Sequence, residues 1–431
     1  MGKHLKCMRK ALAMEERFFL GEGYEISTDP NKTQLNNNIM VVGPSGAGKT
    51  MSYAEMYLLK TVNTSLIVTL TKRRLVKKYK AFFQRKGYAV YDLNLVAPEE
   101  SDVSYDPMIY LHTQADITHL ARSIVMADPR KSTAVTTDPF WDAASISLLS
   151  ALIAYECHVR TRPSFSDVLE LFSRLRITNR GDSIETSLDT IFDRLSDEEP
   201  GSFAWQCWKT FRYAPMRTAG SIYSSLSVTI DTIFTPQLQQ AMKDRPPLNF
   251  LNLSREKSIL FVTTSAVNPS LDAFAGIVYS HGIKELFEHA ESSPGGSLEI
   301  PVHLLCDDFA TGARIPDFPY YISIFREKGI SVSILLQSES QLQYMYGQAA
   351  AQTIINNCDR YIYMGGSDLA TCQSMAQRLG KPLSDVLYMP LGTEYILERG
   401  RKPVFTNRWQ ITEDADWKKL ERSLARSKET R

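Results

Sequence analysis

The sequence of 431 residues lacks any apolar run long enough to cross a membrane. Its longest candidate covers residues 146–155, about half of the roughly 20 residues that a spanning helix requires. The six cysteines are scattered, without a C-x-x-C pair or a Cys/His cluster, which argues against structural zinc and for reduced thiols. The basic N-terminus has no continuous apolar segment, so we expect no secretory signal. These absences predict a cytoplasmic protein.

An excess of charge of one sign is also lacking, since 49 Lys and Arg residues are balanced by 48 Asp and Glu residues. Local charge is uneven, because residues 71–91 carry eight Lys and Arg and no acid, and residues 417–431 are basic as well. The segment 71–91 would suit a phosphate backbone or anionic lipid headgroups, but a solvated helix face explains it equally well. DNA contact of this kind would not be sequence-specific and would weaken with salt.

Short apolar runs alternate with helical patterns along the chain, which is typical of βαβ units and a mainly parallel sheet. We expect helices over residues 48–60 and 271–290, the second with its apolar residues along one face at the 3.6-residue period. Strands are expected at residues 39–43, 65–70, 88–93, 257–264, 302–308, 331–338 and 359–366.

The strand signal disappears over residues 138–245, where Pro and Gly separate successive helical patterns, among them residues 183–195. We therefore predict an all-α domain inserted into an α/β domain. Residues 141–240 contain nine basic and twelve acidic side chains, a net charge of −3, so the insert is no obvious DNA clamp. It suits protein recognition at least as well.

A glycine-rich loop, GPSGAGKT at residues 43–50, matches the pattern G-x-x-x-x-G-K-[ST] after an expected strand and before an expected helix. Its backbone N–H groups can curl around phosphates at the helix N-terminus, Lys49 can reach the β- and γ-phosphates, and Thr50 can ligate Mg²⁺. The loop therefore predicts binding of ATP with Mg²⁺. The expected nucleotide contacts are Gly43, Pro44, Ser45, Gly46, Ala47, Gly48, Lys49, Thr50 and Met51.

Two adjacent carboxylates, Asp307 and Asp308, follow the expected strand 302–308. Asp307 would hold Mg²⁺ through water, and Asp308 would polarise the attacking water. The alternative is an Asp pair that caps a turn between strand and helix. Like charges so close together repel each other, which a cation would relieve.

Two further polar residues suit catalysis of phosphoryl transfer. Gln337 ends the next expected strand, where it would sense the γ-phosphate or orient water, unless it is an ordinary polar residue at a helix start. Arg326 lies between the expected strands 302–308 and 331–338. It would act on the nucleotide of a neighbouring subunit, or simply pair with Glu327 or another surface acid.

These observations predict an α/β fold of the P-loop NTPase type, RecA-like, with a mainly parallel sheet and an inserted all-α domain. The expected segments are an N-terminal segment at residues 1–35, a first nucleotide-binding part at 36–137, the insert at 138–245, a second nucleotide-binding part at 246–410 and a basic tail at 411–431. The tail would be a short amphipathic helix or a disordered arm.

The later part of the chain contains the block DDF…IPDF…R…GI…LLQSESQL…YG…TIINNCD…GG within residues 307–366. Together with the phosphate loop and residues 94–110, 138–155 and 219–226, this block resembles the type IV secretion coupling proteins, the TraG/TraD group of conjugative DNA-transfer ATPases. That group belongs to the ring-forming P-loop motors that include FtsK and HerA. The resemblance covers residues 36–407.

The resemblance implies a homo-hexameric ATPase that brings a relaxase-bound DNA single strand, or protein substrates, to a secretion channel. It implies Walker A roles for Lys49 and Thr50, and Walker B roles for Asp307 and Asp308. It also implies a sensor role for Gln337 and a role in trans for Arg326.

The chain departs from the family pattern at four points. Asp308 stands where Glu is usual, residues 69–72 read T-L-T-K in place of T-D-P-K, and Asp106 stands where Asn is usual. We also expect the N-terminal membrane helices of the family to be absent, because no apolar run of sufficient length occurs in the sequence. We therefore expect a cytoplasmic protein that reaches the inner face of the bacterial cell membrane through a partner, or works elsewhere.

Three functions follow from these patterns. The first is an ATP-hydrolysing motor of conjugative transfer. The second is a soluble DNA translocase in DNA processing or defence, which the expected absence of a membrane anchor favours. The third is an ATP-gated recruitment adaptor with weak hydrolysis, which Asp308 in place of Glu favours.

Overall fold

The computed structural model describes residues 15–71, 73–127, 139–180, 183–265, 268–309 and 314–429. Residues 1–14 of the expected N-terminal segment, Lys72 of the basic segment and the expected boundary at 137/138 lie outside the described residues. The strands of the large sheet are β3 (Ile39–Val42), β4 (Ser65–Leu70), β5 (Ala89–Asn94), β8 (Ser258–Thr263), β9 (Val302–Cys306), β10 (Ile330–Leu336), β11 (Arg360–Tyr363), β12 (Thr393–Glu398) and β13 (Val404–Asn407).

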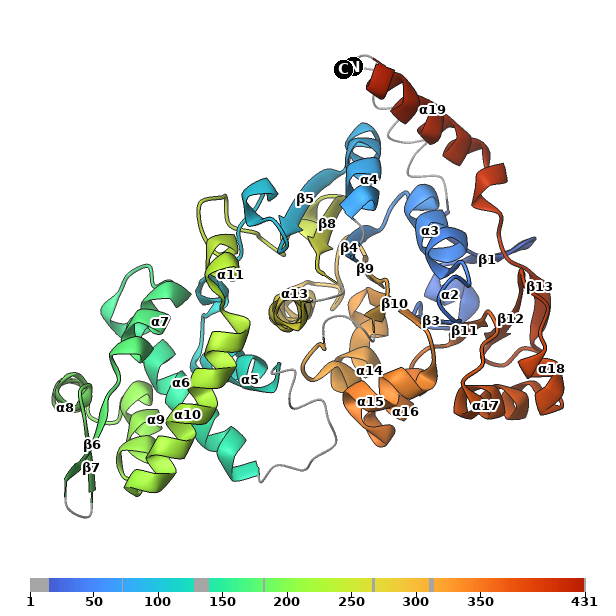
Figure 1. Ribbon diagram of the computed structural model, residues 1–431. Coiled ribbons are helices and arrows are strands. Elements are labelled where there is room, and N and C mark those ends of the chain that lie inside the picture. The colour runs from blue at the N-terminus through green and yellow to red at the C-terminus, as the bar shows by residue number, and fades with distance from the viewer. Residues whose placement is uncertain are drawn as a thin grey trace.

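Within the described residues, nine strands form one sheet in the order β13-β12-β11-β3-β10-β9-β4-β8-β5 (Figure 1). All strands from β11 to β5 run parallel, and every residue of β3, β4, β8, β9, β10 and β11 is buried. Strands buried on both faces read as continuous apolar runs, which is why the sequence predicts them well. The antiparallel hairpin β12–β13 at the edge was not predicted.

Successive side chains of each strand point to opposite faces of the sheet, so apolar residues are present on both faces. Helices cover both faces and bury them. Ile39 and Val41 pack on one side with η1, α3, α4, α19 and the hairpin β1–β2, while Met40 and Val42 pack on the other side with α5, α13, α14 and α16. The bounds are β1 (Arg17–Gly21), β2 (Tyr24–Ser27), η1 (Lys49–Ala54), α3 (Glu55–Lys60), α4 (Arg73–Arg85), α5 (Gln114–Met126), α13 (Pro269–Ser292), α14 (Phe318–Lys328), α16 (Gln348–Asn356) and α19 (Ala415–Glu429).

The insert lies on the side of the molecule opposite β12 and β13 (Figure 1). Its apolar residues belong to the same continuous core as one face of the sheet, so the insert does not have a separate core. Its helices are α6 (Pro139–Val159), α7 (Phe165–Arg174), α8 (Asp189–Glu198), α9 (Phe203–Arg212), α10 (Met216–Ile233) and α11 (Pro236–Ala241).

The prediction that the insert is all-α is wrong at one place. β6 (Ile177–Arg180) and β7 (Ser183–Thr186) form an antiparallel hairpin within it. β-Branched residues suit a pleated surface better than a helix, and Ile184 is fully buried from β7. A hairpin satisfies its backbone locally and needs no strand of the main sheet, so it is compatible with a helical surrounding.

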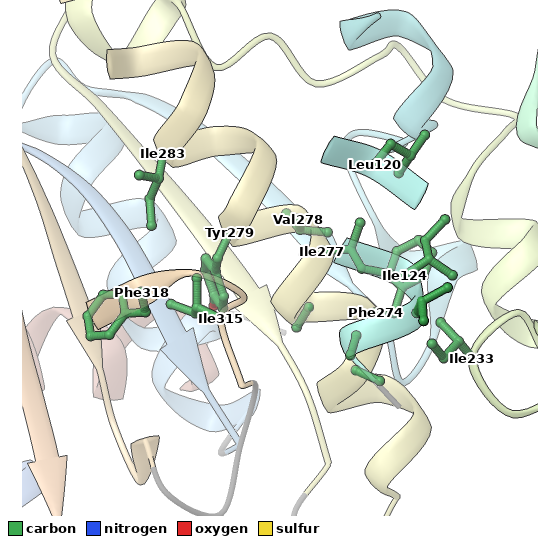
Figure 2. Packing of buried hydrophobic residues seen from close by; sticks show 14 of the residues in the cluster. Leu120, Ile124, Ile233, Phe274, Ile277, Val278, Tyr279, Ile283, Ile315 and Phe318 are labelled. Carbon is green, nitrogen blue, oxygen red and sulfur yellow. The ribbon is translucent and has the colours of Figure 1, made fainter. Parts of the chain in front are cut away.

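Helix α13 connects the insert to the sheet. Phe274 lies toward Ile124 of α5, whereas Tyr279 lies toward Ile315 at the start of the α14 region (Figure 2). The prediction of a single apolar face is therefore wrong for this helix, which is buried on both sides through its middle. A helix that is apolar all round belongs in the interior of a large domain, and α13 lies between two layers.

The basic tail forms the amphipathic helix α19 and is not a disordered arm. Leu420 of this helix is buried against the α3–α4 face of the sheet. No helix within the described ranges combines the length and the apolar composition that crossing a membrane would require. The remaining helices are α2 (Pro30–Thr33), α12 (Asn252–Arg255), α15 (Glu339–Tyr346), α17 (Leu369–Leu379) and α18 (Leu383–Leu387).

Candidate nucleotide-binding site

The glycine-rich loop joins the carboxyl end of β3 to η1, a π-helical turn that continues into α3. Gly46 (φ 78°) and Gly48 (φ 89°) are in the left-handed region, which glycine adopts at little cost. A Cβ atom on Gly43 would lie 2.8 Å from Cβ of Met364, so this position has no room for a side chain. The first N–H groups of a helix have no partner within it, which makes the end of this loop a place where an anion can bind.

Lys49 is buried inside the curl of this loop. Its Nζ donates hydrogen bonds to the carbonyls of Gly43 (2.6 Å) and Pro44 (3.2 Å). These bonds hold the ammonium group next to the loop's own backbone. From there it can exchange carbonyl oxygens for phosphate oxygens without leaving the loop.

Asp307 follows β9, and β10 separates β9 from β3 in the sheet. The hydroxyl of Thr50 nevertheless donates to the buried carboxylate of Asp307, with distances of 2.9 and 3.1 Å to its two oxygens. A hydroxyl beside a carboxylate is a donor set that suits Mg²⁺, which binds few protein ligands and takes its other oxygens from water and phosphates. Among the described residues, no group of three or more His, Cys, Asp and Glu is placed to hold a metal ion.

Asp308 adopts a left-handed backbone conformation, with φ of 51°. Its side chain is partly exposed, whereas that of Asp307 is buried. Asp enters the left-handed region more readily than most residues, because its short polar side chain can hydrogen-bond locally. The turn thus directs the two neighbouring carboxylates into different surroundings.

Gln337 directly follows β10, the strand that separates the phosphate loop from Asp307. The N–H of Gly43 donates to the carbonyl of Leu336 (3.1 Å), which brings the loop beside Gln337. The N–H of Gln337 donates to Oε1 of Gln341 (3.1 Å) in the first turns of α15. The structure therefore brings Lys49, Asp307 and Gln337 together at the carboxyl edge of the sheet.

Arg326 is at the opposite edge of the sheet. It is exposed near the C-terminal end of α14 and lines a small cavity of about 100 Å³ with Asn37, Pro301 and Gly329, which precede β3, β9 and β10. β10 spans about 20 Å at roughly 3.3 Å per residue, so Arg326 cannot reach the phosphate loop of its own chain. No ion pair joins Arg326 to an acid of the described residues, so the expected pairing with Glu327 is not formed there.

The sequence analysis did not identify Arg408, which follows β13 and contacts the phosphate loop. Its Nη1 donates to the carbonyl of Ala47, its Nη2 to that of Met364 (2.9 Å) and its Nε to that of Thr393 (3.2 Å). No motif surrounds this arginine, and 361 residues separate it from Ala47. Nothing in the local sequence could have indicated the contact.

Asp106, one of the departures from the family pattern, joins the sheet domain to the insert. Its carboxylate accepts hydrogen bonds from the N–H of Met108 (2.9 Å) and from the N–H of Phe165 (3.1 Å), the first residue of α7. Burial raises the pKa of Asp106 to about 6, although these hydrogen bonds favour the charged form.

Among the described residues of the basic segment 71–91, most of the basic side chains are engaged in contacts with other parts of the protein. Lys86 donates to the carbonyls of Leu59 (3.1 Å) and Thr61, and burial lowers its pKa to about 8. Arg74 and Lys77 are exposed. A phosphate backbone or a lipid surface would therefore meet fewer charges than the sequence suggests. The ion pairs of the segment include Arg73 with Asp92 (2.6 Å), Lys78 with Glu55 (2.8 Å) and Lys80 with Asp102 (2.6 Å).

Comparison with solved structures finds a fold of the same kind. The bacterial conjugative coupling protein TrwBdeltaN70 matches with a TM-score of 0.67 and 17% identity, covering 96% of this chain and 92% of that one. The plasmid coupling protein TrwB in complex with ADPNP also has a TM-score of 0.67, at 18% identity, with 95% and 92% covered. VirB4 of Thermoanaerobacter pseudethanolicus matches with a TM-score of 0.53 and 13% identity over 91% of this chain and 96% of that one.

At identities this low, the likeness to solved structures establishes the fold alone. Comparison with curated protein sequences gives no match. Residues 5–383, by contrast, match the family model described as type IV secretory system conjugative DNA transfer. A match over most of the chain, together with the phosphate loop and Asp307 at one sheet edge, shows that the chain belongs to the type IV secretory system conjugative DNA transfer family.

Proposed function

We propose that the chain is an ATP-hydrolysing motor that couples DNA or protein substrates to a type IV secretion channel. The observation that carries the proposal is the contact of Thr50 with Asp307 beside the buried Lys49, at the carboxyl edge of a parallel sheet. This is where ligands bind in open α/β sheets. TrwB, which has the same fold, has been solved with the ATP analogue ADPNP and with ADP and Mg²⁺.

The chain's own groups divide the work in this proposal. The loop 43–50 and Met51 bind the nucleotide, with Lys49 on the β- and γ-phosphate oxygens. Mg²⁺, when bound by Thr50 and Asp307, neutralises charge that develops on the phosphates. Asp308 accepts a proton from the attacking water, and Gln337 orients that water from the end of β10.

Arg326 completes the site of a neighbouring copy in this proposal. The phosphate loop is at the carboxyl edge of the sheet and Arg326 is at the amino edge, so the two surfaces can meet only between different subunits. Such a head-to-tail contact is heterologous, and it closes into a ring when the rotation between subunits permits. The family resemblance favours six subunits.

The proposed cargo is single-stranded DNA, bound without sequence preference and delivered with a relaxase, or another secreted protein. A contact to the membrane and the channel would be made through a partner protein. The family match favours conjugative transfer over a translocase of DNA processing or defence. The second candidate function is an ATP-gated recruitment adaptor that hydrolyses ATP weakly. The left-handed backbone conformation of Asp308 favours it.

An ATPase assay with and without single-stranded DNA tests the proposal. Multiple turnovers stimulated by DNA are expected of the wild-type protein, and Lys49→Ala should reduce the rate to the background. Wild-type protein that binds ATP with Mg²⁺ but shows no multiple turnover under either condition would favour the adaptor. Full activity of Lys49→Ala would show that the loop takes no part in ATP hydrolysis.

A further inference from the structure

Arg408 connects the phosphate loop to the end of the sheet that carries β11, β12 and β13. Its guanidinium group donates to the carbonyl of Ala47 in the loop, to that of Met364 after β11 and to that of Thr393 at the start of β12. Met364 also lies beside the loop, because its N–H donates to the carbonyl of Val42 (2.8 Å), the last residue of β3 before the loop begins. The planar fork of an arginine can hold several carbonyls in one fixed arrangement.

The bond to Ala47 has a consequence for the neighbouring peptide group. In a planar trans peptide, the C=O of Ala47 and the N–H of Gly48 point in opposite directions. Because Arg408 holds the carbonyl, the Gly48 N–H is directed to the other side of the peptide plane. Gly48 has φ of 89°, a conformation that a glycine leaves easily unless something fixes it.

The surroundings of Arg408 make its charge costly to bury. Such a cost is not expected of a residue whose only role is to join strands. The side chain is partly buried, and burial lowers its pKa, so its charge is withdrawn from water. The nearby carboxyl group of Glu394 is buried, and neither of its oxygens has a hydrogen-bond partner among the described residues. Arg408 forms no ion pair with an acid in the described part of the chain, and the attraction of Glu394 offsets its desolvation only in part, so its carbonyl contacts must contribute to the compensation.

We propose that Arg408 is a positioning residue for nucleotide binding: by holding the carbonyl of Ala47, it fixes the loop so that the N–H of Gly48 faces the phosphates of the nucleotide. The inference rests on the proposed function, because it assumes that the loop binds a nucleoside polyphosphate. In this proposal Arg408 acts through the backbone of the loop.

Arg408→Ala and Arg408→Lys test the proposal, with Arg399→Ala as a matched control. Arg399 follows β12 and pairs with Asp359 (2.9 Å) at the other edge of the sheet, so its loss removes a polar contact without touching the loop. The dissociation constant of ADP with Mg²⁺ is measured by titration calorimetry. We expect an increase of about tenfold or more for Arg408→Ala, a smaller increase for Arg408→Lys and no change for Arg399→Ala.

Hydrogen exchange of residues 43–50 without nucleotide gives a second readout. Faster exchange in Arg408→Ala, with exchange in Arg399→Ala equal to wild type, is expected if Arg408 holds the loop. Unchanged ADP affinity in a folded Arg408→Ala or Arg408→Lys protein would overturn the inference while the proposed function stands. Failure of the wild-type protein to bind ADP with Mg²⁺ would instead overturn the proposed function.

Discussion

Asp308 illustrates how one residue's backbone shapes the chemistry of the site. Its positive φ places the carboxylate on a turn, where Asp is tolerated better than a longer acid. The usual Glu would reach about 1.5 Å further, by one C–C bond. The turn and the shorter side chain therefore act together, and the position of the carboxylate depends on both.

We predict that Asp308→Asn lowers kcat by at least about 100-fold while the KM for ATP changes by about twofold or less. Asn tolerates the left-handed conformation as Asp does, so the substitution removes the charge without straining the backbone. Steady-state ATPase kinetics with single-stranded DNA provide the measurement. Asp244→Asn is the control, since Asp244 (φ 69°) also has a left-handed conformation but lies at the end of the insert. A variant with more than half of the wild-type kcat would exclude the role in polarising water.

Glu394 couples stability to pH. Burial raises the pKa of Glu394 to about 8 in the folded protein, from an ordinary value of 4.5, so the folded chain holds a proton that the unfolded chain has lost. The stabilisation that this proton represents is fully present below about pH 4.5 and is lost as the pH rises through 8.

We predict that Glu394→Gln has a higher free energy of unfolding than wild type near pH 8, by on the order of 3 kcal/mol, and that the difference shrinks toward pH 5. Denaturant unfolding at several pH values measures this. The exposed Glu99→Gln should follow the wild-type curve. Parallel curves for Glu394→Gln and wild type would show that Glu394 is not the titrating group.

At the scale of elements, α19 behaves as part of the core on the α3–α4 face. Leu420 is buried there, Lys60 pairs with Asp414 (2.7 Å) before the helix, and Lys78 pairs with Glu421 (2.8 Å) within it. Part of the basic charge of α4 is therefore used to hold this helix. The charges that appear in the sequence as a candidate surface patch contribute instead to packing between helices.

We predict that Leu420→Ala lowers the free energy of unfolding by about 2–3 kcal/mol, because it removes buried methyl groups and leaves a cavity. Thermal or denaturant unfolding gives the value, and the exposed Lys418→Ala on the same helix is the control. Equal stability of the two variants would mean that α19 does not contribute to the core in solution.

At the scale of the whole molecule, the sheet separates the two halves of the proposed catalytic site. The phosphate loop lies at one edge and Arg326 at the other, with the length of β10 between them. In the proposed mechanism, a single chain therefore contains one incomplete site and the residue that would complete another. This separation predicts that turnover depends on assembly.

We predict that Arg326→Ala abolishes turnover but keeps nucleotide affinity, and that mixing it with Lys49→Ala restores activity. In mixed rings, an Arg326→Ala subunit supplies an intact loop and its Lys49→Ala neighbour supplies the arginine. With equal amounts and independent sites, roughly a quarter of the interfaces would be complete. ATPase rates of the separate and mixed variants measure this, and a mixture as inactive as its parts would argue against a role in trans.

The outcome of the sequence analysis depended on how local each determinant is. Strands buried on both faces, such as β4 and β9, could be predicted because burial imposes continuous apolar runs. The hairpin β6–β7 was missed because its short strands are surrounded by helical patterns, and its pairing is decided by the partner strand. The single apolar face expected for α13 was wrong because periodicity does not reveal how many layers will cover a helix.

The sequence by itself determined the phosphate loop, since its glycines and the adjoining Lys49 and Thr50 act within a few residues of one another. The sequence also predicted that Thr50 and Asp307 serve the same Mg²⁺, and their side chains are in contact. Only the tertiary structure decided the position of Arg326 at the far edge and the hold of Arg408 on Ala47. The physical reason is that strand order in a parallel sheet is set by the packing of crossover helices. Residues hundreds of positions apart therefore meet, or are kept apart, without a local signal in the chain.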